Sequence, residues 1–408
     1  MPVQNTDRNT TWLLNVPNQT WTLTKNATIT TVNEDGIYEG SNPSKIIVKG
    51  DIKVTGIGEA GIRFDGSASS VEIGKDSVVN ANAAFYGIWA EGAGSDIVNR
   101  GVVRGGEAGI YGSIWADVKN FGTLGGHIAV LFVGDASQIY NYGKMAGSGY
   151  GISTGASETY ILNDKGARIS GSMGGILLDG PGETEILNKG LITSADDAIR
   201  LLDSASLHLV NKGKIQGDIV LADSTNFIDT RKGDIKGVIE GGSDDDTILI
   251  GSKITFTDTS DTDFDQVRSL VGYRLSAHVE ALTLLGKANI NGTGNAGANE
   301  LTGNSGNNRL TGLNGNDHLD GRQGNDRLTG NLGADTFHFN KGYDVDRITD
   351  FQDGMDRIDS AMVKTQQQFD NLNIRQTPDG VVINFGHGDR LIIDDVLKTD
   401  IDFNDFVV

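Results

Sequence analysis

The sequence predicts an all-β protein, built as an elongated parallel β-helix followed by a parallel β-roll and a β-rich C-terminal flank. Three observations point to this fold class. The 408 residues include 57 Gly, 5 Pro and only 7% aromatic residues, which favours short strands joined by tight turns. Residues 46–240 repeat every 21 to 25 positions, and residues 294–338 repeat every nine. Repeats this short cannot bury a core alone, so they are expected to stack as coils.

The net charge of −20 is concentrated in the second part of the chain. Residues 241–408 carry 27 acidic and 14 basic side chains, whereas residues 1–240 carry 27 and 20. This acidity argues against nucleic acid and an anionic membrane face as partners and favours metal cations. The chain has no cysteine, which excludes disulfides, cysteine-based zinc sites and thiol chemistry. No apolar run approaches the roughly 18 residues of a membrane span, and the N-terminus lacks an apolar signal segment, so export is expected to use another signal.

The longer repeat is marked by asparagines that each precede a glycine. Spacings of 21, 21, 22, 25 and 23 residues separate Asn99, Asn120, Asn141, Asn163, Asn188 and Asn211. Short apolar stretches lie between them without a helical period. We interpret residues 46–240 as the parallel β-helix, with a ladder of asparagine amides along its axis and glycines at the coil corners. Residues 1–45 are expected to form an N-terminal cap, because an open solenoid end invites aggregation.

The shorter repeat forms five consecutive nonapeptides from Gly294: GNAGANELT, GNSGNNRLT, GLNGNDHLD, GRQGNDRLT and GNLGADTFH. Glycine fills positions one and four, an acid or amide fills position six, and an apolar residue fills position eight. Two nonapeptides are expected to make one coil of 18 residues, with inward side chains from Leu301, Leu310, Leu319, Leu328 and Phe337. A forerunner, GGSDDDTIL, begins at Gly241, so residues 241–293 are interpreted as an isolated nonapeptide and connector before the roll at residues 294–345.

Position six carries the chemistry expected of the roll. Successive coils place these residues 18 positions apart, so Asp317 should meet Asp335. By the same spacing, Asp326 should meet Asn308 on one side and Asp344 on the other. Adjacent carboxylates repel each other unless a cation lies between them, and six or more carboxylate and carbonyl oxygens suit calcium better than magnesium. The candidate metal-site residues are Asn299, Asn308, Gly312, Gly315, Asp317, Gly321, Gly324, Asp326, Gly330, Gly333, Asp335 and Asp344, with Asp246 of the forerunner as a further candidate.

This nonapeptide resembles the hemolysin-type calcium-binding repeat of RTX proteins, G-G-x-G-x-D-x-U-x. The resemblance implies a parallel β-roll with calcium between successive turns. The sequence departs from the family pattern at two positions. Position two, where the family prefers glycine, holds Asn295, Asn304, Leu313, Arg322 and Asn331. Position six is asparagine in the first two repeats, at Asn299 and Asn308, so Asp317 with Asp335 is the best carboxylate pair.

The segment after the repeats, DVDRITDFQDGMDRID, resembles the one that follows them in secreted RTX proteins. The last residues, DFNDFVV, place an acid before several apolar residues and look like the uncleaved signal of type I secretion. Residues 346–408 are therefore interpreted as a C-terminal flank with a secretion signal. The resemblance implies that type I secretion machinery is a partner and that the protein is extracellular or attached to the cell surface. The acidic half is expected to fold there on binding calcium.

Two hypotheses stay open for the β-helix. HExxH is absent, which argues against the RTX metalloproteases, and no long apolar segment supports a pore former. The stretch SADDAIRLL gathers Asp196, Asp197 and Arg200, which could supply acid and base to a polysaccharide lyase, epimerase or glycosidase, although the same positions fit the coil repeat. The loose N-x-G-x-I pattern resembles β-helical adhesins. It favours a non-catalytic protein that binds a cell surface, matrix or exopolysaccharide.

Overall fold

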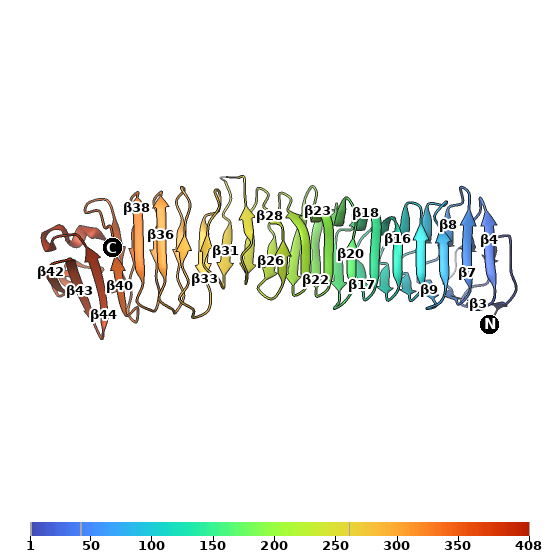
Figure 1. Ribbon diagram of the computed structural model, residues 1–408, viewed down its shortest axis with the longest axis horizontal. Helices are drawn as coiled ribbons and strands as arrows, with labels where there is room; N and C mark the ends of the chain where they lie inside the picture. The colour runs from blue at the N-terminus through green and yellow to red at the C-terminus, as the bar shows by residue number, and fades with distance from the viewer. Residues whose placement is uncertain (1, 41–42, 261, 408) are drawn as a thin grey trace. The chain divides into compact units, whose positions relative to one another are not determined.

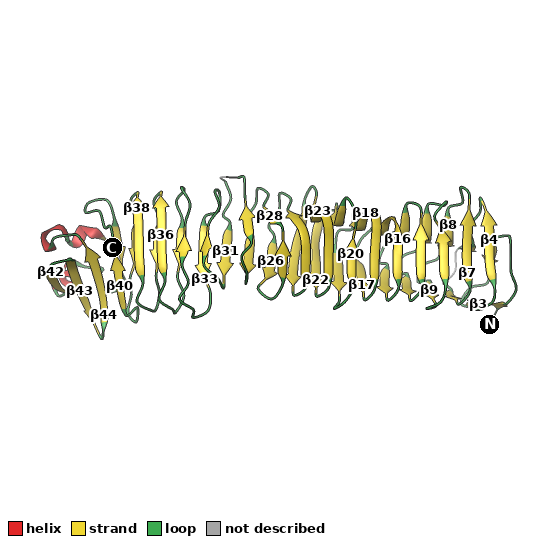
Figure 2. Cartoon of the chain, in the orientation of Figure 1, coloured by secondary structure: helices red, strands yellow, loops and turns green. Residues whose placement is uncertain are grey.

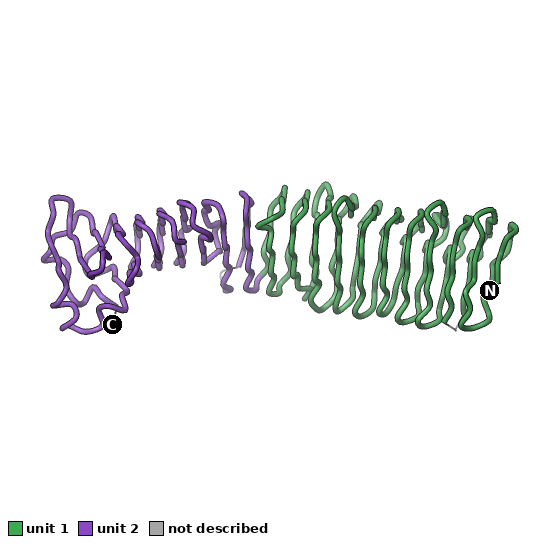
Figure 3. The backbone as a smooth tube through the Cα atoms, turned by 90° about the horizontal axis from the view of Figure 1, so that it is seen from below, with its two compact units in different colours: residues 1–242 green, residues 243–408 purple. Residues whose placement is uncertain are grey.

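The computed structural model describes residues 2–40, 43–260 and 262–407, and the chain divides into two compact units, residues 1–242 and 243–408 (Figure 3). Each unit is a parallel β-solenoid, which confirms the all-β class. Figure 2 shows strands connected by loops almost throughout the chain. Helical segments among the described residues belong to the second unit: α1 (Gln366–Asp370), η1 (Lys398–Asp400) and η2 (Phe403–Asp405).

Each coil of the first unit contributes strands to three columns of parallel strands (Figure 1). Exposure alternates along these strands, so one side of each column faces the interior. The first column contains β1 (Val3–Gln4), β3 (Thr20–Leu23), β6 (Lys45–Val48), β9 (Ser70–Ile73), β12 (Asp96–Asn99), β15 (Asp117–Asn120), β17 (Ser137–Asn141), β19 (Thr159–Asn163), β22 (Gly182–Asn188), β24 (Ala205–Asn211) and β26 (Phe227–Thr230).

The other two columns share a corner that four long strands turn without a break: β16 (Thr123–Phe132), β18 (Lys144–Thr154), β23 (Leu191–Leu201) and β25 (Lys214–Val220). The second column also contains β4 (Thr28–Val32), β7 (Asp51–Thr55), β10 (Val78–Ala81), β13 (Val102–Gly105), β20 (Arg168–Ser170) and β27 (Asp234–Lys236). The third also contains β2 (Trp12–Leu14), β5 (Ile37–Glu39), β8 (Ala60–Phe64), β11 (Tyr86–Ala90), β14 (Ala108–Gly112), β21 (Gly174–Leu178) and β28 (Val238–Glu240).

The interior of the first unit is a stack of aliphatic side chains in register. One row on the third column is fully buried and consists of Ile37, Ile62, Ile88, Ile110, Val130, Ile152, Ile176, Ile199, Ile219 and Ile239. Each such side chain stabilises the fold by about 1.5–3 kcal/mol through burial. Consecutive coils thus share one continuous core, although no single coil has a core of its own.

The asparagine ladder predicted from the long repeat is confirmed. All six asparagines are buried, and each side-chain amide donates to the side-chain oxygen of the next one, as Asn120 Nδ2 does to Asn141 Oδ1 at 2.9 Å. In five of the six, all but Asn163, the side-chain oxygen also accepts the N–H of the glycine two residues later, as Asn99 Oδ1 does from Gly101 at 3.0 Å. A Cβ at Gly101 would fall 2.3 Å from the carbonyl oxygen of Ser77, so close coil stacking requires glycine there.

The described part of residues 1–45 already follows the coil pattern. Strands β2 and β3 pair in parallel with β5 and β6, in the same columns as the later coils. Trp12 and Trp21 are nearly buried and meet edge to face with centroids 5.9 Å apart. A capping role for this segment stays a prediction.

The second unit is a roll with two main columns of strands. The first contains β29 (Thr247–Ile250), β31 (Gln266–Ser269), β33 (Ala281–Leu284), β35 (Glu300–Thr302), β37 (His318–Asp320), β39 (Thr336–His338), β41 (Arg357–Asp359) and β45 (Phe406–Val407). The second contains β32 (Tyr273–Arg274), β34 (Gly292–Thr293), β36 (Arg309–Asn314), β38 (Arg327–Leu332), β40 (Val345–Ile348) and β44 (Asp389–Asp394). Strand β30 (Thr255–Thr257) lies between β29 and β31 in sequence.

The 18-residue coil predicted from two nonapeptides is confirmed by the strand register. Leu301 pairs with Leu319, Leu319 pairs with Phe337, and Leu310 pairs with Leu328. All five predicted inward side chains are fully buried. Successive nonapeptides therefore feed opposite columns of the roll.

Residues 243–293, interpreted as connector, continue the first column of the roll. Thr247 pairs with Gln266, Gln266 with Ala281, and Ala281 with Glu300. These spacings are unequal, which hides the coils from a search for a fixed period. The C-terminal flank closes the unit with an antiparallel meander in which β42 (Asn373–Thr377) pairs with β43 (Gly380–Gly386) and β43 with β44.

Candidate functional site

The position-six residues of the roll end the glycine turns and form two columns. The structure places Asn299, Asp317, Asp335 and Asp356 in one column and Asn308, Asp326 and Asp346 in the other. One oxygen of each carboxylate accepts the backbone N–H of the residue one coil earlier. Asp335 Oδ1 lies 2.9 Å from the nitrogen of Asp317, and Asp346 Oδ1 lies 2.9 Å from that of Asp326. Each carboxylate is thus oriented by the coil before it.

The second carboxylate oxygen is buried without a partner. This holds for Oδ2 of Asp317, Asp326, Asp335 and Asp346. An unsatisfied buried polar atom costs about 1–3 kcal/mol, and a charged one costs more. A cation bound to these oxygens would remove that cost, so the residues present fit a metal ion with oxygen ligands.

Glycine at position one leaves room for the free oxygen. A Cβ at Gly312 would fall 2.1 Å from Asp317 Oδ2, and a Cβ at Gly330 would fall 2.0 Å from Asp335 Oδ2. The corresponding distance from Gly321 to Asp326 Oδ2 would be 2.5 Å. Any larger residue at position one would displace the carboxylate from the turn.

Glycine at position four lets one turn lie on the next. Gly315, Gly324 and Gly333 have φ of 110°, 123° and 148°, a region that favours glycine. A Cβ at Gly333 would fall 1.8 Å from the carbonyl oxygen of Gly315. Turn carbonyls are therefore held within a short distance of the neighbouring coil, where they can supplement the carboxylates as ligands.

The backbone conformation at position two explains why glycine would suit the repeat there. Leu313, Arg322 and Asn331 have φ of 94°, 64° and 71°, which side chains other than glycine adopt at a cost. The sequence departs here from the family pattern without a change of backbone path. Strain at these positions lowers the stability of the turns.

Asn299 and Asn308 take the position of the aspartates but satisfy their side chains within the protein. Asn299 Oδ1 accepts the N–H of Asn295 at 2.7 Å, and its Nδ2 donates to Asn295 Oδ1 at 3.0 Å. Asn308 Oδ1 accepts the N–H of Asn304 at 2.8 Å, and its Nδ2 donates to the carbonyl oxygen of Ile290 at 2.8 Å. These amides stabilise the first turns through hydrogen bonds within the protein.

The partner predicted for Asp326 is corrected by the structure. Asp346, rather than Asp344, accepts the N–H of Asp326, because two extra residues lengthen this coil from 18 to 20 positions. Asp344 lies two residues before Asp346 and accepts the N–H of Gly324 at 3.3 Å. Sequence reasoning also missed Asp356, whose Oδ1 accepts the N–H of Asp335 at 2.9 Å. The signal was an aspartate two residues before a buried apolar residue, as in Asp346-Arg-Ile and Asp356-Arg-Ile.

Burial makes these carboxylates weak acids in the metal-free protein. It raises the pKa of Asp317 and of Asp326 to about 7, opposed in part by the N–H that each accepts. Burial raises the pKa of Asp335 to about 6 and that of Asp346 to about 8, with neighbouring carboxylates adding to the effect. The columns therefore resist ionisation unless a positive charge is bound between them.

The forerunner places Asp246 in an equivalent position at the start of the second unit. Asp246 is buried, and its N–H donates to Asp265 Oδ1 at 2.8 Å. The N–H of Asp265 in turn donates to Glu280 Oε2 at 2.8 Å. Acidic residues thus continue the column ahead of the five nonapeptides.

The candidate catalytic residues of the first unit lie on β23. Asp197 is buried and forms an ion pair with Arg200, while Asp196 is exposed and its N–H donates to Ser194 Oγ at 3.3 Å. The structure therefore brings Asp197 and Arg200 together and leaves Asp196 apart from that pair. Asp197 and Arg200 are thus each other's partners on one strand.

A row of large side chains faces outward along the third column of the first unit. It consists of Leu13, Tyr38, Arg63, Trp89, Tyr111 and Leu131, which are in register on consecutive coils, and we call it the aromatic row. The Arg63 guanidinium lies 4.1 Å from the ring centroid of Trp89 and 5.6 Å from that of Tyr38. Rings in this row are half-buried, so they offer flat apolar surface with little freedom to move.

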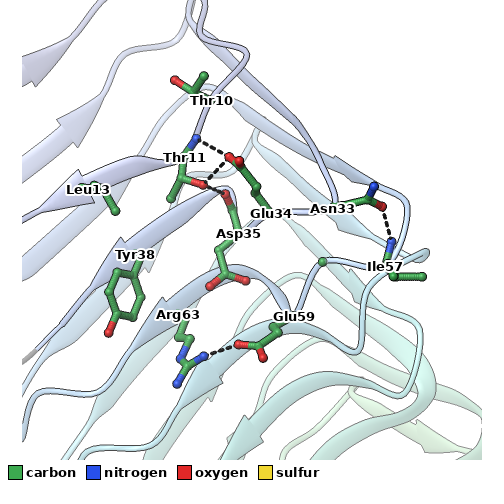
Figure 4. A pocket seen from close by; sticks show the side chains of 11 residues that line it. Thr10, Thr11, Leu13, Asn33, Glu34, Asp35, Tyr38, Ile57, Glu59 and Arg63 are labelled. Carbon is green, nitrogen blue, oxygen red and sulfur yellow. Dashed lines mark hydrogen bonds and ion pairs between the residues drawn. The ribbon is translucent and has the colours of Figure 1, made fainter.

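A pocket of about 800 Å³ adjoins the N-terminal end of the aromatic row (Figure 4). Tyr38, Arg63, Glu59 and Asp35 border it, and Arg63 is paired with Glu59. Thr11 Oγ1 donates to the Glu34 carboxylate at 3.0 Å across the top of the pocket in this view. Acidic groups outnumber basic ones here.

Comparison with known proteins identifies the repeats. The family model of the RTX calcium-binding nonapeptide repeat (4 copies) matches residues 293–328 and 311–346. A search of curated proteins gives no match. Among solved structures, the AlgE6R3 subunit from the Azotobacter vinelandii mannuronan C5-epimerase matches at 24% identity with a TM-score of 0.24, covering 31% of this chain and 82% of that chain.

The metal of the roll is calcium, because RTX nonapeptide repeats bind calcium and the free buried oxygens lie in the matched residues. In the described part of the chain, no helix is long and apolar enough to cross a membrane.

Proposed function

Because residues 293–346 carry RTX calcium-binding repeats, we propose that this chain is a secreted protein whose second unit folds outside the cell on binding calcium. We further propose that its first unit then attaches to a cell surface, matrix or exopolysaccharide without catalysis. The observation that carries the proposal is the set of buried carboxylate oxygens without partners. The folded second unit needs their charge to be neutralised.

The difference in free calcium between the cytosol and the outside of the cell would decide where the second unit folds. Extracellular calcium modules have dissociation constants of about 10⁻⁴–10⁻³ M, so such sites fill outside a cell and stay empty in a cytosol poor in calcium. Because the calcium sites exist only in the folded state, the free energy of calcium binding contributes to the free energy of folding. The second unit is therefore expected to remain unfolded until export.

The C-terminal residues support the same order of events. Asp405 and Phe406, within the proposed secretion signal, are buried in the folded second unit. Type I secretion machinery would have to bind this segment before the unit folds. Low cytosolic calcium would keep the segment accessible.

The aromatic row supports an extended glycan as the partner of the first unit. Parallel strands lie about 4.8 Å apart, so ring-bearing side chains on successive coils present stacking surfaces at a spacing close to one sugar residue. Tyr38, Trp89 and Tyr111 supply flat faces for sugar rings, and the carboxylates near Arg63 supply hydrogen-bond acceptors for hydroxyls. The excess of acidic groups favours a neutral glycan over a polyanionic one.

The experiment is affinity electrophoresis of the full chain in about 1 mM calcium against neutral and acidic polysaccharides. Trp89→Ala with Tyr111→Ala should weaken binding to the preferred glycan by at least tenfold. Trp115→Ala, which removes an exposed ring outside the row, should leave it unchanged. Equal binding by all three proteins would contradict a glycan surface on this row.

The same incubations address the alternative of a polysaccharide-active enzyme. New reducing or unsaturated ends should not form. Turnover that Asp197→Asn abolishes, while circular dichroism shows the variant to be folded, would establish the enzyme in place of the non-catalytic protein.

A further inference from the structure

The second unit contains a cluster of three carboxylates ahead of the RTX repeats. Asp258 and Asp263 lie between β30 and β31, and Asp265 immediately precedes β31. One oxygen from each of the three lies within 4.8 Å of the others. None of the three belongs to the residues matched by the repeat family, which begin at residue 293.

Two of the carboxylates are oriented by hydrogen bonds that leave their other oxygen free. Asp265 is fully buried; its Oδ1 accepts the N–H of Asp246 at 2.8 Å, and its Oδ2 has no partner. Asp258 is 6% exposed; its Oδ2 accepts the N–H of Ser260 at 2.7 Å, and its Oδ1 has no partner. Both oxygens of Asp263 are also shielded from solvent without a hydrogen bond.

The surroundings add negative charge. Glu280 accepts the N–H of Asp265 at 2.8 Å, and its carboxylate is close enough to Asp258 and Asp263 for their charges to raise its pKa, although burial has the larger effect. Three carboxylates that converge in a buried space repel each other strongly. Free, shielded carboxylate oxygens from three residues converge here and can supply part of the six to eight oxygen ligands that calcium takes.

We propose that Asp258, Asp263 and Asp265 bind a calcium ion at a site separate from the nonapeptide repeats. The donor set consists of carboxylate oxygens, which suits a hard cation rather than zinc. An irregular loop with several carboxylates suits the flexible coordination of calcium better than the octahedron of magnesium. The ion would fasten the β30–β31 loop to the coil that carries Asp246 and Asp265.

The test counts calcium ions bound to the full chain by equilibrium dialysis at about 1 mM calcium. Asp263→Asn should bind one ion fewer than the unsubstituted protein. Asp244→Asn, which removes the same charge from an exposed side chain of this unit, should keep the full number. Asp335→Asn should lose one of the calcium ions bound by the nonapeptide repeats. The double variant with Asp335→Asn and Asp263→Asn should bind one ion fewer than Asp335→Asn alone. Equal numbers in Asp263→Asn and the unsubstituted protein would overturn the proposal.

A second measurement covers the outcome in which Asp263→Asn does not fold, as judged by circular dichroism in calcium. Crystals of the unsubstituted protein grown in calcium should show an anomalous peak between the three carboxylates. Calcium peaks in the repeats with none at this cluster would refute the site.

Discussion

Each position-six aspartate of the roll performs two tasks with one side chain. Asp317 Oδ1 accepts the N–H of Asn299 at 2.8 Å, while its Oδ2 is left buried and free. An asparagine lacks the charge for the second task, and Asn299 and Asn308 also differ in the first, because each side-chain oxygen accepts an N–H within its own turn, from Asn295 and Asn304. We therefore expect aspartate at position six to mark turns that bind calcium, and asparagine to mark turns that bind it more weakly or serve only as structural turns.

Asp335→Asn is expected to separate the two tasks. The amide keeps an oxygen for the N–H of Asp317, so the fold in calcium should persist, while calcium affinity should fall by roughly tenfold or more because ligand charge sets affinity. Isothermal titration with calcium measures the change. Asp370→Asn, an exposed residue at the end of α1, is the charge-matched control. An unchanged affinity in Asp335→Asn would show that its carboxylate does not bind calcium.

Leu313→Gly is expected to stabilise the roll. Leu313 has a φ of 94° and is only partly buried, so glycine should relieve strain of about 1 kcal/mol at little loss of packing. Gly315→Ala should do the opposite, because its φ is 110° and a Cβ would fall 2.3 Å from the carbonyl oxygen of Gly297. Thermal unfolding in saturating calcium measures both. A lower midpoint for Leu313→Gly would mean that its side chain contributes more than its backbone costs.

Acid should stabilise the second unit when calcium is absent. The pKa of Asp317 rises to about 7 and that of Asp346 to about 8, from 3.8 in an unfolded chain. The folded state then binds protons more tightly, so stability is gained below the folded pKa values and lost as pH rises through them. Urea midpoints in chelator should be higher at pH 5.5 than at pH 8.5. With calcium present the order should reverse, because protons compete with the metal. A midpoint in chelator that rises with pH would contradict this assignment.

At the level of strands and turns, the sequence allowed us to predict the features whose residues recur at regular or nearly regular intervals. The inward leucines recur every nine residues and the ladder asparagines every 21 to 25, and both occur as expected. Coils of unequal length escaped detection, since the pairings of Gln266 with Thr247 and Ala281 differ in spacing. The same cause misplaced the partner of Asp326. The aromatic row was missed because its members share a register but no residue type.

The asparagine ladder should contribute measurably to the first unit. Asn141→Ala removes an amide that is fully buried and leaves the N–H of Gly143 and the side-chain oxygen of Asn163 without their partner. The expected loss is about 2–4 kcal/mol of unfolding free energy. Urea unfolding followed by tryptophan fluorescence measures it, with exposed Asn82→Ala as the control. A loss equal to the control would mean that strand pairing alone holds the coils.

The two units depend on different sources of stability. The first unit relies on a continuous aliphatic interior and on uncharged amides. The second has a similar interior but also buries carboxylates, whose charge must be neutralised for the coils to stack. We therefore expect one chain to combine a unit that folds without metal and a unit that needs metal to fold.

Chelation should consequently unfold one unit and spare the other. With excess chelator at pH 7.5, hydrogen exchange measured by mass spectrometry should show fast exchange throughout residues 262–407 and protection from residue 43 to residue 240. Calcium at about 1 mM should restore protection to the second unit, because metal binding supplies its folding free energy. Magnesium at the same concentration is the control and should restore little, since the turns offer an irregular set of oxygens. Protection of residues 300–359 that is equal with chelator and with calcium would show that the roll folds on its aliphatic core alone.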